Sequence, residues 1–142
     1  MFNPGLQCID GDVKLGSDGT PFYFKSGKFH PICRRRFNVS VHGARLFCKK
    51  LGYDSGVVSS SGFPLEMDAI GVGECLKGDA DISSCTGQCS TYDVAGMCPG
   101  LSSKCGVGFN GGITINCIGG KNIRTSSCKG KTFLRFVIYW YF

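Results

Sequence analysis

The sequence lacks the short motifs that mark common metal and catalytic centres. It has no Cys-x2-Cys pair and only two histidines, so zinc binding explains its ten cysteines poorly. Gly-x-Ser-x-Gly, His-Glu-x-x-His and a phosphate-binding loop are also absent. Cys33, which precedes three arginines, is the one candidate nucleophile, and a structural disulfide is the better interpretation of it. A small redox or hydrolytic enzyme is therefore the least favoured class, and we expect a binding module and no enzyme.

A signal peptide and a membrane-length apolar run are missing too. Residues 1–11 show no basic region followed by an apolar stretch. The apolar tail, residues 133–142, has about half of the 20 residues that a membrane helix needs. Its aromatic and β-branched content predicts a closing β-strand, with a truncated membrane anchor or non-native sequence as alternatives. A disulfide-rich chain without an export signal is expected to be a fragment of a longer secreted or membrane protein, or to have a misassigned start.

Cysteine and glycine are abundant instead. Ten cysteines in 142 residues indicate disulfides and an oxidising, extracellular environment. Twenty-two glycines and 12% aromatic residues favour short strands joined by turns. Strands are expected at residues 13–15, 22–25, 29–33 and 113–118, with further short strands at 57–58 and 65–70.

One helix is expected, over about residues 41–51. Its apolar residues recur with the helical period of 3.6. Ser40 is a suitable N-cap, Lys49 and Lys50 complement the helix dipole, and Gly52 is placed to end the helix. A single apolar stripe on this helix predicts that it lies on a sheet, which makes the fold α+β.

The charges are arranged in three zones. Residues 19–53 hold eight basic residues and no acid, residues 54–93 hold seven acids and Lys77, and residues 94–142 hold six basic residues and no acid. Such a distribution predicts a cationic face that attracts polyanions.

Four motifs occur in order between residues 12 and 98. They are Gly-x-Phe-x-x-Ile-Cys at residues 27–33, Ala-x-x-x-Cys-x-x-Leu-Gly at 44–52, Cys-x-x-Gly-Asp-x-x-Ile-x-x-Cys at 75–85 and Asp-Val-Ala-Gly-Met-Cys at 93–98. In this order they resemble the scavenger receptor cysteine-rich (SRCR) family. Tyr53 stands where one subgroup has an additional cysteine, so the chain resembles the three-disulfide subgroup.

The resemblance implies a curved antiparallel sheet that cradles one helix, and three disulfides. The implied pairs are Cys33–Cys89, Cys48–Cys98 and Cys75–Cys85. Four cysteines lie outside the resemblance, and their three pairings stay open: Cys8, Cys105, Cys117 and Cys128. Pairing of Cys8 with Cys105 or Cys117 would tie the C-terminal part back to the domain. The chain then divides into a lead-in (1–11), an SRCR-like domain (12–98), a Gly/Cys-rich extension (99–132) and the apolar tail (133–142).

The resemblance also bears on ligands. SRCR domains often bind calcium through two Asp residues after the first matched cysteine and an acidic residue after the fifth. In this chain Arg34 and Arg35 occupy the two Asp positions, and only Asp93, near the third position, is acidic. We therefore expect no metal and no cofactor.

The basic residues around these positions form the predicted binding patch: Arg34, Arg35, Arg36, Arg45 and Lys49. Guanidinium groups bind sulfate, phosphate and carboxylate groups. The predicted partners are sulfated glycans, lipopolysaccharide or nucleic acid without sequence specificity, besides protein ligands and other modules of a longer chain. The alternatives are a protein-interaction or adhesion module without polyanion affinity, and arginines that pair with the acidic region 79–93. Asn38 begins a glycosylation sequon that would place a glycan beside this patch.

Overall fold

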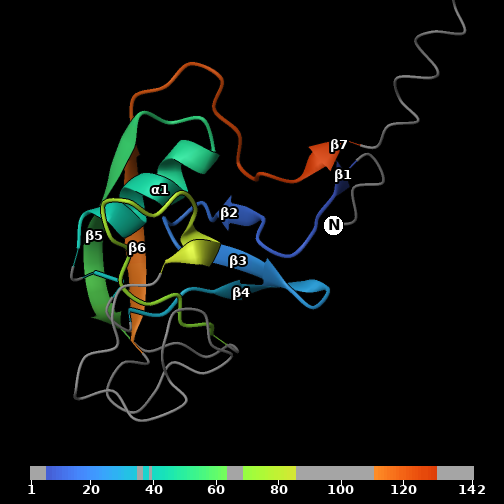
Figure 1. Cartoon of the computed structure of the whole chain (residues 1–142). Coiled ribbons are helices and arrows are strands. Elements are labelled where there is room, and N and C mark those ends of the chain that lie inside the picture. Colours follow the sequence, from blue (N-terminus) through green and yellow to red (C-terminus); the bar gives the residue numbers. More distant parts are fainter. Residues whose placement is uncertain (1–5, 35–36, 39, 64–68, 86–110, 131–142) are drawn as a thin grey trace, which may run out of the picture.

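A three-stranded antiparallel sheet forms the N-terminal part of the fold (Figure 1). The computed structural model of the chain describes residues 6–34, 37–38, 40–63, 69–85 and 111–130. Strands β2 (Val13–Leu15), β3 (Pro21–Lys25) and β4 (Lys28–Pro31) follow one another in space as in sequence. Ser26 and Gly27 join β3 to β4 with φ of 52° and 86°, the left-handed values that a two-residue hairpin turn requires. The strands predicted from alternation and turn residues are thus confirmed here.

The longest strands are β5 (Ser55–Phe63) and β6 (Gly112–Ile118), which pair antiparallel with two register shifts. Strand β6 confirms the strand predicted at residues 113–118, and β5 extends the short strand predicted at residues 57–58. Ile113 and Ile115 of β6 are buried in the core. Strand β6, which lies within the extension predicted over residues 99–132, therefore contributes to the main core.

Helix α1 (His42–Lys50) confirms the one predicted helix. The Ser40 hydroxyl accepts the His42 N–H at 3.0 Å, although the helix begins one residue later than predicted, with Val41 as N-cap. At the other end, the Gly52 N–H donates to the Lys49 carbonyl and the Tyr53 N–H to the Cys48 carbonyl. These two bonds and the φ of +95° at Gly52 form a Schellman C-cap.

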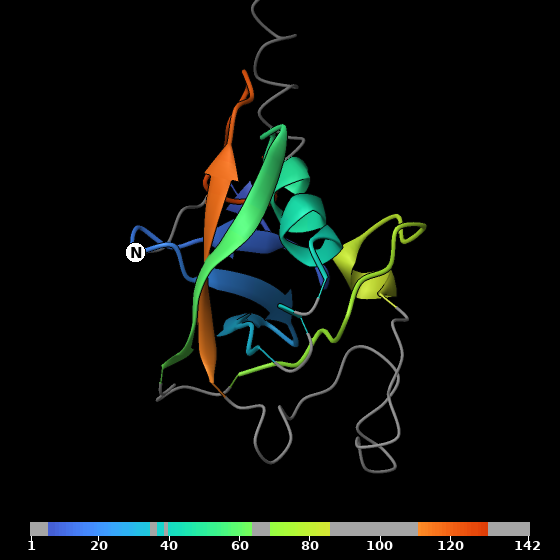
Figure 2. The ribbon, with the colours of Figure 1, turned by 90° about the vertical axis from the view of Figure 1, so that its left-hand side faces the viewer.

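The helix lies between strands and a short 3-10 helix. Figure 2 shows α1 alongside β5, with η1 (Ile82–Ser84) on the side away from that strand. Ala44 and Phe47 of the helix are buried, as are Phe37 before it and Leu51 after it. The core they form also includes Val13, Tyr23, Ile32, Ile70, Val72, Ile82, Ile113 and Ile115. The structure is thus an α+β domain, and its described part contains no helix long and apolar enough to cross a membrane.

The two ends of the described chain meet in a third sheet. Strands β1 (Leu6–Gln7) and β7 (Lys129–Gly130) pair antiparallel (Figure 1). A disulfide joins Cys8 to Cys128 beside this pair. The chain after Cys98 is therefore tied back to its beginning, through a pairing that the sequence left open.

The disulfides support the predicted oxidising environment and correct one predicted pair. The pair Cys75–Cys85 is confirmed. Cys48 is bonded to Cys117, so the implied pair Cys48–Cys98 is wrong. The physical reason is that β5 and β6 pack beside α1, and Gly56, the register partner of Cys117, leaves room for the Cys48 sulfur. A Cβ atom at Gly56 would lie 2.2 Å from that sulfur.

The implied pair Cys33–Cys89 lies outside the described residues, because Cys89 does. Cys33 itself is fully buried and disulfide-bonded. It therefore carries no thiol that could act as a nucleophile. Cys105 and Cys98 also lie outside the described residues.

Candidate anion-binding site

Two of the five predicted ligand residues, Arg45 and Lys49, line one surface pocket of 210 Å³. The pocket lies between α1 and the turn at residues 76–79. Arg45 is half-buried and Lys49 is exposed. The remaining wall of the pocket consists of His42, Leu46, Leu76, Lys77 and Asp79.

The spacing of three residues along α1 places their side chains at the pocket. Arg45 and Lys49 are four residues apart and His42 is three before Arg45, so the three side chains emerge from one face of α1. Nη1 of Arg45 lies 3.4 Å from Nδ1 of His42, close enough for the imidazole to accept a hydrogen bond. His42 therefore helps to orient the guanidinium group at the edge of the pocket.

The opposite wall is a loop closed by the Cys75–Cys85 disulfide. Within it, Asp79 Oδ2 accepts the Leu76 N–H at 2.7 Å, and the Asp79 N–H donates to the Leu76 carbonyl at 3.0 Å. These two bonds make a tight turn that carries Lys77 at its tip, where it is exposed. A third cationic side chain thus faces the two on the helix.

Two polar interactions connect the loop to α1 and to the residue before its N-cap. The Ser40 hydroxyl donates to the Cys75 carbonyl at 2.7 Å, and Lys50 Nζ lies 2.8 Å from Asp81 Oδ1. Burial alone would raise the pKa of Asp81, but hydrogen bonds from Lys50 and Ser83 outweigh it and lower that pKa. The two walls of the pocket are therefore held in a fixed relation.

Cationic side chains outnumber carboxylates in this pocket. Among the described residues that line the pocket, three are cationic (Arg45, Lys49 and Lys77) and one is a carboxylate, Asp79, one oxygen of which holds the turn. Lys50 adds no charge to the pocket, because it pairs with Asp81. The arrangement suits the binding of an anionic group by several separate donors.

Of the other three predicted ligand residues, only Arg34 lies within the described residues, and the structure does not bring it to this pocket. Arg34 is half-buried, its backbone N–H donates to the Gly111 carbonyl at 2.8 Å, and it does not line the pocket. Arg35 and Arg36 lie outside the described residues. Of the acidic region 79–93 that was an alternative partner, Asp81 pairs with Lys50, and residues 86–93 lie outside the described residues.

Lys77 and His42 were not predicted as site residues. A signal for Lys77 was present, because it is the one basic residue among the acids of residues 54–93 and lies two residues after Cys75. No comparable signal marked His42, whose contribution depends on the orientation of the helix. The predicted glycosylation site, Asn38, is exposed, and its modification stays a prediction.

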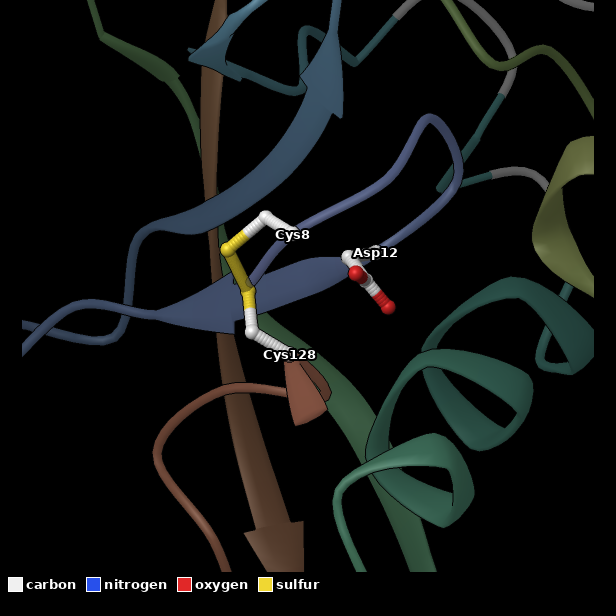
Figure 3. Close-up of side chains that lie close together, drawn as sticks. All are labelled: Cys8, Asp12 and Cys128. Atoms are coloured by element: carbon white, nitrogen blue, oxygen red, sulfur yellow. A yellow bond between two sulfur atoms is a disulfide. The ribbon is translucent and has the colours of Figure 1, made fainter. Parts of the chain in front are cut away.

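A second cluster, Cys8, Asp12 and Cys128, has the residue types and spacing of a metal site. Both sulfurs are taken up by the disulfide, and Figure 3 shows the Asp12 carboxylate pointing away from it. Asp12 Oδ2 accepts the Ile9 N–H, and Oδ1 accepts the Ser127 hydroxyl. These bonds give the cluster a structural role at the junction of the two chain ends.

In comparisons with known proteins, the chain matches no family model, no curated protein and no solved structure.

Proposed function

We propose that this chain is an extracellular ligand-binding module that recognises polyanions through a basic patch. The observation that carries this is the convergence of Arg45, Lys49 and Lys77 on one pocket. The sequence resemblance to SRCR domains supports the same class of function, and the disulfides fit an extracellular location. The predicted patch thereby gains Lys77, alongside Arg34, Arg35 and Arg36.

The strength of these contacts favours a repetitive ligand over a small anion. Exposed charge pairs contribute about 0.2–1 kcal/mol each, so three of them fall short of the roughly 4 kcal/mol that corresponds to a millimolar Kd. A polymer with many sulfate or phosphate groups can bind the pocket and other basic side chains of the module at the same time. It also releases counterions on binding, which makes the affinity strongly dependent on salt.

Elution from a heparin column by a salt gradient tests this proposal. The variant Arg45→Gln/Lys49→Gln/Lys77→Gln is expected to elute at clearly lower salt than the wild type. A matched control, Lys121→Gln/Arg124→Gln/Lys129→Gln, removes the same charge from exposed positions that do not line the pocket. It is expected to shift much less. Equal shifts of the two variants would show that net charge alone attracts heparin.

A second comparison tests the arginine run. Arg34→Ala/Arg35→Ala/Arg36→Ala is expected to elute earlier than the wild type, and elution at the same salt removes these residues from the site. Absence of any heparin retention by the wild type at low salt would favour the alternative, a protein-interaction module without polyanion affinity.

A further inference from the structure

A second pocket, of 360 Å³, lies between the turn after β2 and strands β5 and β6. It shares no lining residue with the cationic pocket. Asp18 and two glycines of the turn form one wall, and Ser59 of β5 and Asn116 of β6 form another. Its volume falls within the range of small-molecule sites, about 300–1,000 Å³.

The turn that forms one wall is built in a fixed shape. The Gly16 N–H donates to the Thr20 carbonyl at 2.8 Å, and the Gly19 N–H donates to the Gly16 carbonyl at 2.9 Å. The Gly19 carbonyl in turn accepts the Ile115 N–H of β6 at 2.8 Å. Gly19 has a φ of +90°, which a residue with a side chain rarely adopts. The pocket is therefore formed before any ligand arrives.

Hydrogen-bonding groups of several kinds line this pocket. Oδ1 of Asp18 accepts the Thr20 N–H at 2.9 Å, and this bond lowers the pKa of Asp18, so its carboxylate is charged at neutral pH. Asn116 is exposed and brings an amide, and Ser59 is exposed and brings a hydroxyl. Tyr53 packs partly on the core and adds an aromatic ring to the wall.

The charge of the wall limits the ligand. Among the lining residues that the structure describes, Asp18 is the single ionised side chain, so an anionic ligand is repelled by this wall. A cationic ligand is disfavoured at long range by the net charge of +6. A neutral ligand rich in hydroxyls uses all the groups present: the carboxylate accepts, the amide donates and accepts, and the ring packs against C–H groups.

We infer that this pocket binds a neutral sugar residue, with Asp18 and Asn116 bonded to its hydroxyls and Tyr53 against its ring. This site is independent of the proposed polyanion site. The two would allow one module to bind a charged and an uncharged part of the same glycan-coated surface.

Saturation-transfer NMR with the methyl glycosides of glucose, galactose, mannose and N-acetylglucosamine tests the inference. At least one glycoside is expected to bind the wild type, and Asp18→Asn/Asn116→Ala is expected to weaken it at least about tenfold, for two lost hydrogen bonds. The control Asn122→Ala changes an exposed asparagine outside the pocket and is expected to retain binding.

Three outcomes overturn the inference: no signal from any of the four glycosides, equal binding by both variants, or binding of arginine amide in place of sugars. Heparin elution of the same variants separates the two proposals. The Asp18→Asn/Asn116→Ala variant loses one negative charge and should elute at no lower salt than the wild type, whichever way the glycoside experiment turns out.

Discussion

Cys48, in the last turns of α1, is bonded to Cys117 on β6, so the helix is fixed to a strand 69 residues further along the chain. The bridge crosses Gly56 of β5, which lies between them without a side chain. Strand β6 thereby becomes part of the structure that carries Arg45 and Lys49.

Loss of this bridge should destabilise the fold more than loss of Cys75–Cys85. In the chain-entropy description, a loop of 69 residues corresponds to about 4 kcal/mol and one of 10 residues to about 3 kcal/mol. Urea unfolding of Cys48→Ala/Cys117→Ala and Cys75→Ala/Cys85→Ala measures the two free energies. The reverse order would contradict the prediction. Peptide mapping without reduction is an independent check, since a fragment linking Cys48 to Cys98 would contradict the bridge directly.

The secondary-structure elements that depend on a local sequence pattern were predicted well. The helix follows from a 3.6-residue period with a polar residue before it and Gly52 after it, and β3 follows from an aromatic run between turn residues. Such signals depend on neighbours within a few residues, which the sequence displays directly. The pair Cys75–Cys85 was predicted from the resemblance to SRCR domains and not from spacing, and it too joins residues close in sequence, ten positions apart.

Long-range relations were predicted less well, for a physical reason. Any cysteine that can reach Cys48 satisfies its chemistry, and only the position of β6 selects Cys117. Lys77 belongs to the cationic pocket because a closed loop folds back over α1, a relation absent from the charge pattern. The cation-rich zone was thus predictable from the sequence, but the position of Lys77 opposite the helix was not.

Ser127 links two distant segments in the protein interior, and its removal should be costly. Its hydroxyl donates to Asp12 Oδ1 and accepts the Val13 N–H, both at 2.8 Å, and Ser127 is 4% exposed. Ser127→Ala leaves a buried N–H and a buried carboxylate oxygen without this partner, and we expect a loss of about 2–3 kcal/mol by urea unfolding.

Ser84→Ala is the matched control for this substitution. The Ser84 hydroxyl also accepts a backbone N–H and donates to an oxygen, both of Asp81, but Ser84 is exposed. Water replaces these bonds after the substitution, so a loss below about 1 kcal/mol is expected. Equal losses for the two variants would show that burial of the Ser127 bonds adds nothing.

The ion pair between Lys50 and Asp81 should make stability depend on pH in the acid range. Burial opposes ionisation of Asp81, but the bonds from Lys50 and Ser83 hold its pKa below the ordinary value of 3.8. A carboxyl with a lowered pKa in the folded state stabilises it above the unfolded pKa, and this contribution is lost as the pH falls through the folded pKa. The relevant range therefore begins near pH 5 and continues to below pH 4.

Asp81→Asn removes the charge while keeping an oxygen that can cap η1. Because Asp81 is partly exposed, we expect a loss of about 0.5–1 kcal/mol at pH 7. The difference from the wild type should shrink as the pH falls below the ordinary carboxyl range and through the lowered pKa of folded Asp81. Urea unfolding at several pH values measures this, with Asp10→Asn as a control, since Asp10 accepts the Ser26 N–H at an exposed position. A pH-independent difference would mean that the charge of Asp81 does not hold the Cys75–Cys85 loop, and with it Lys77, against the helix.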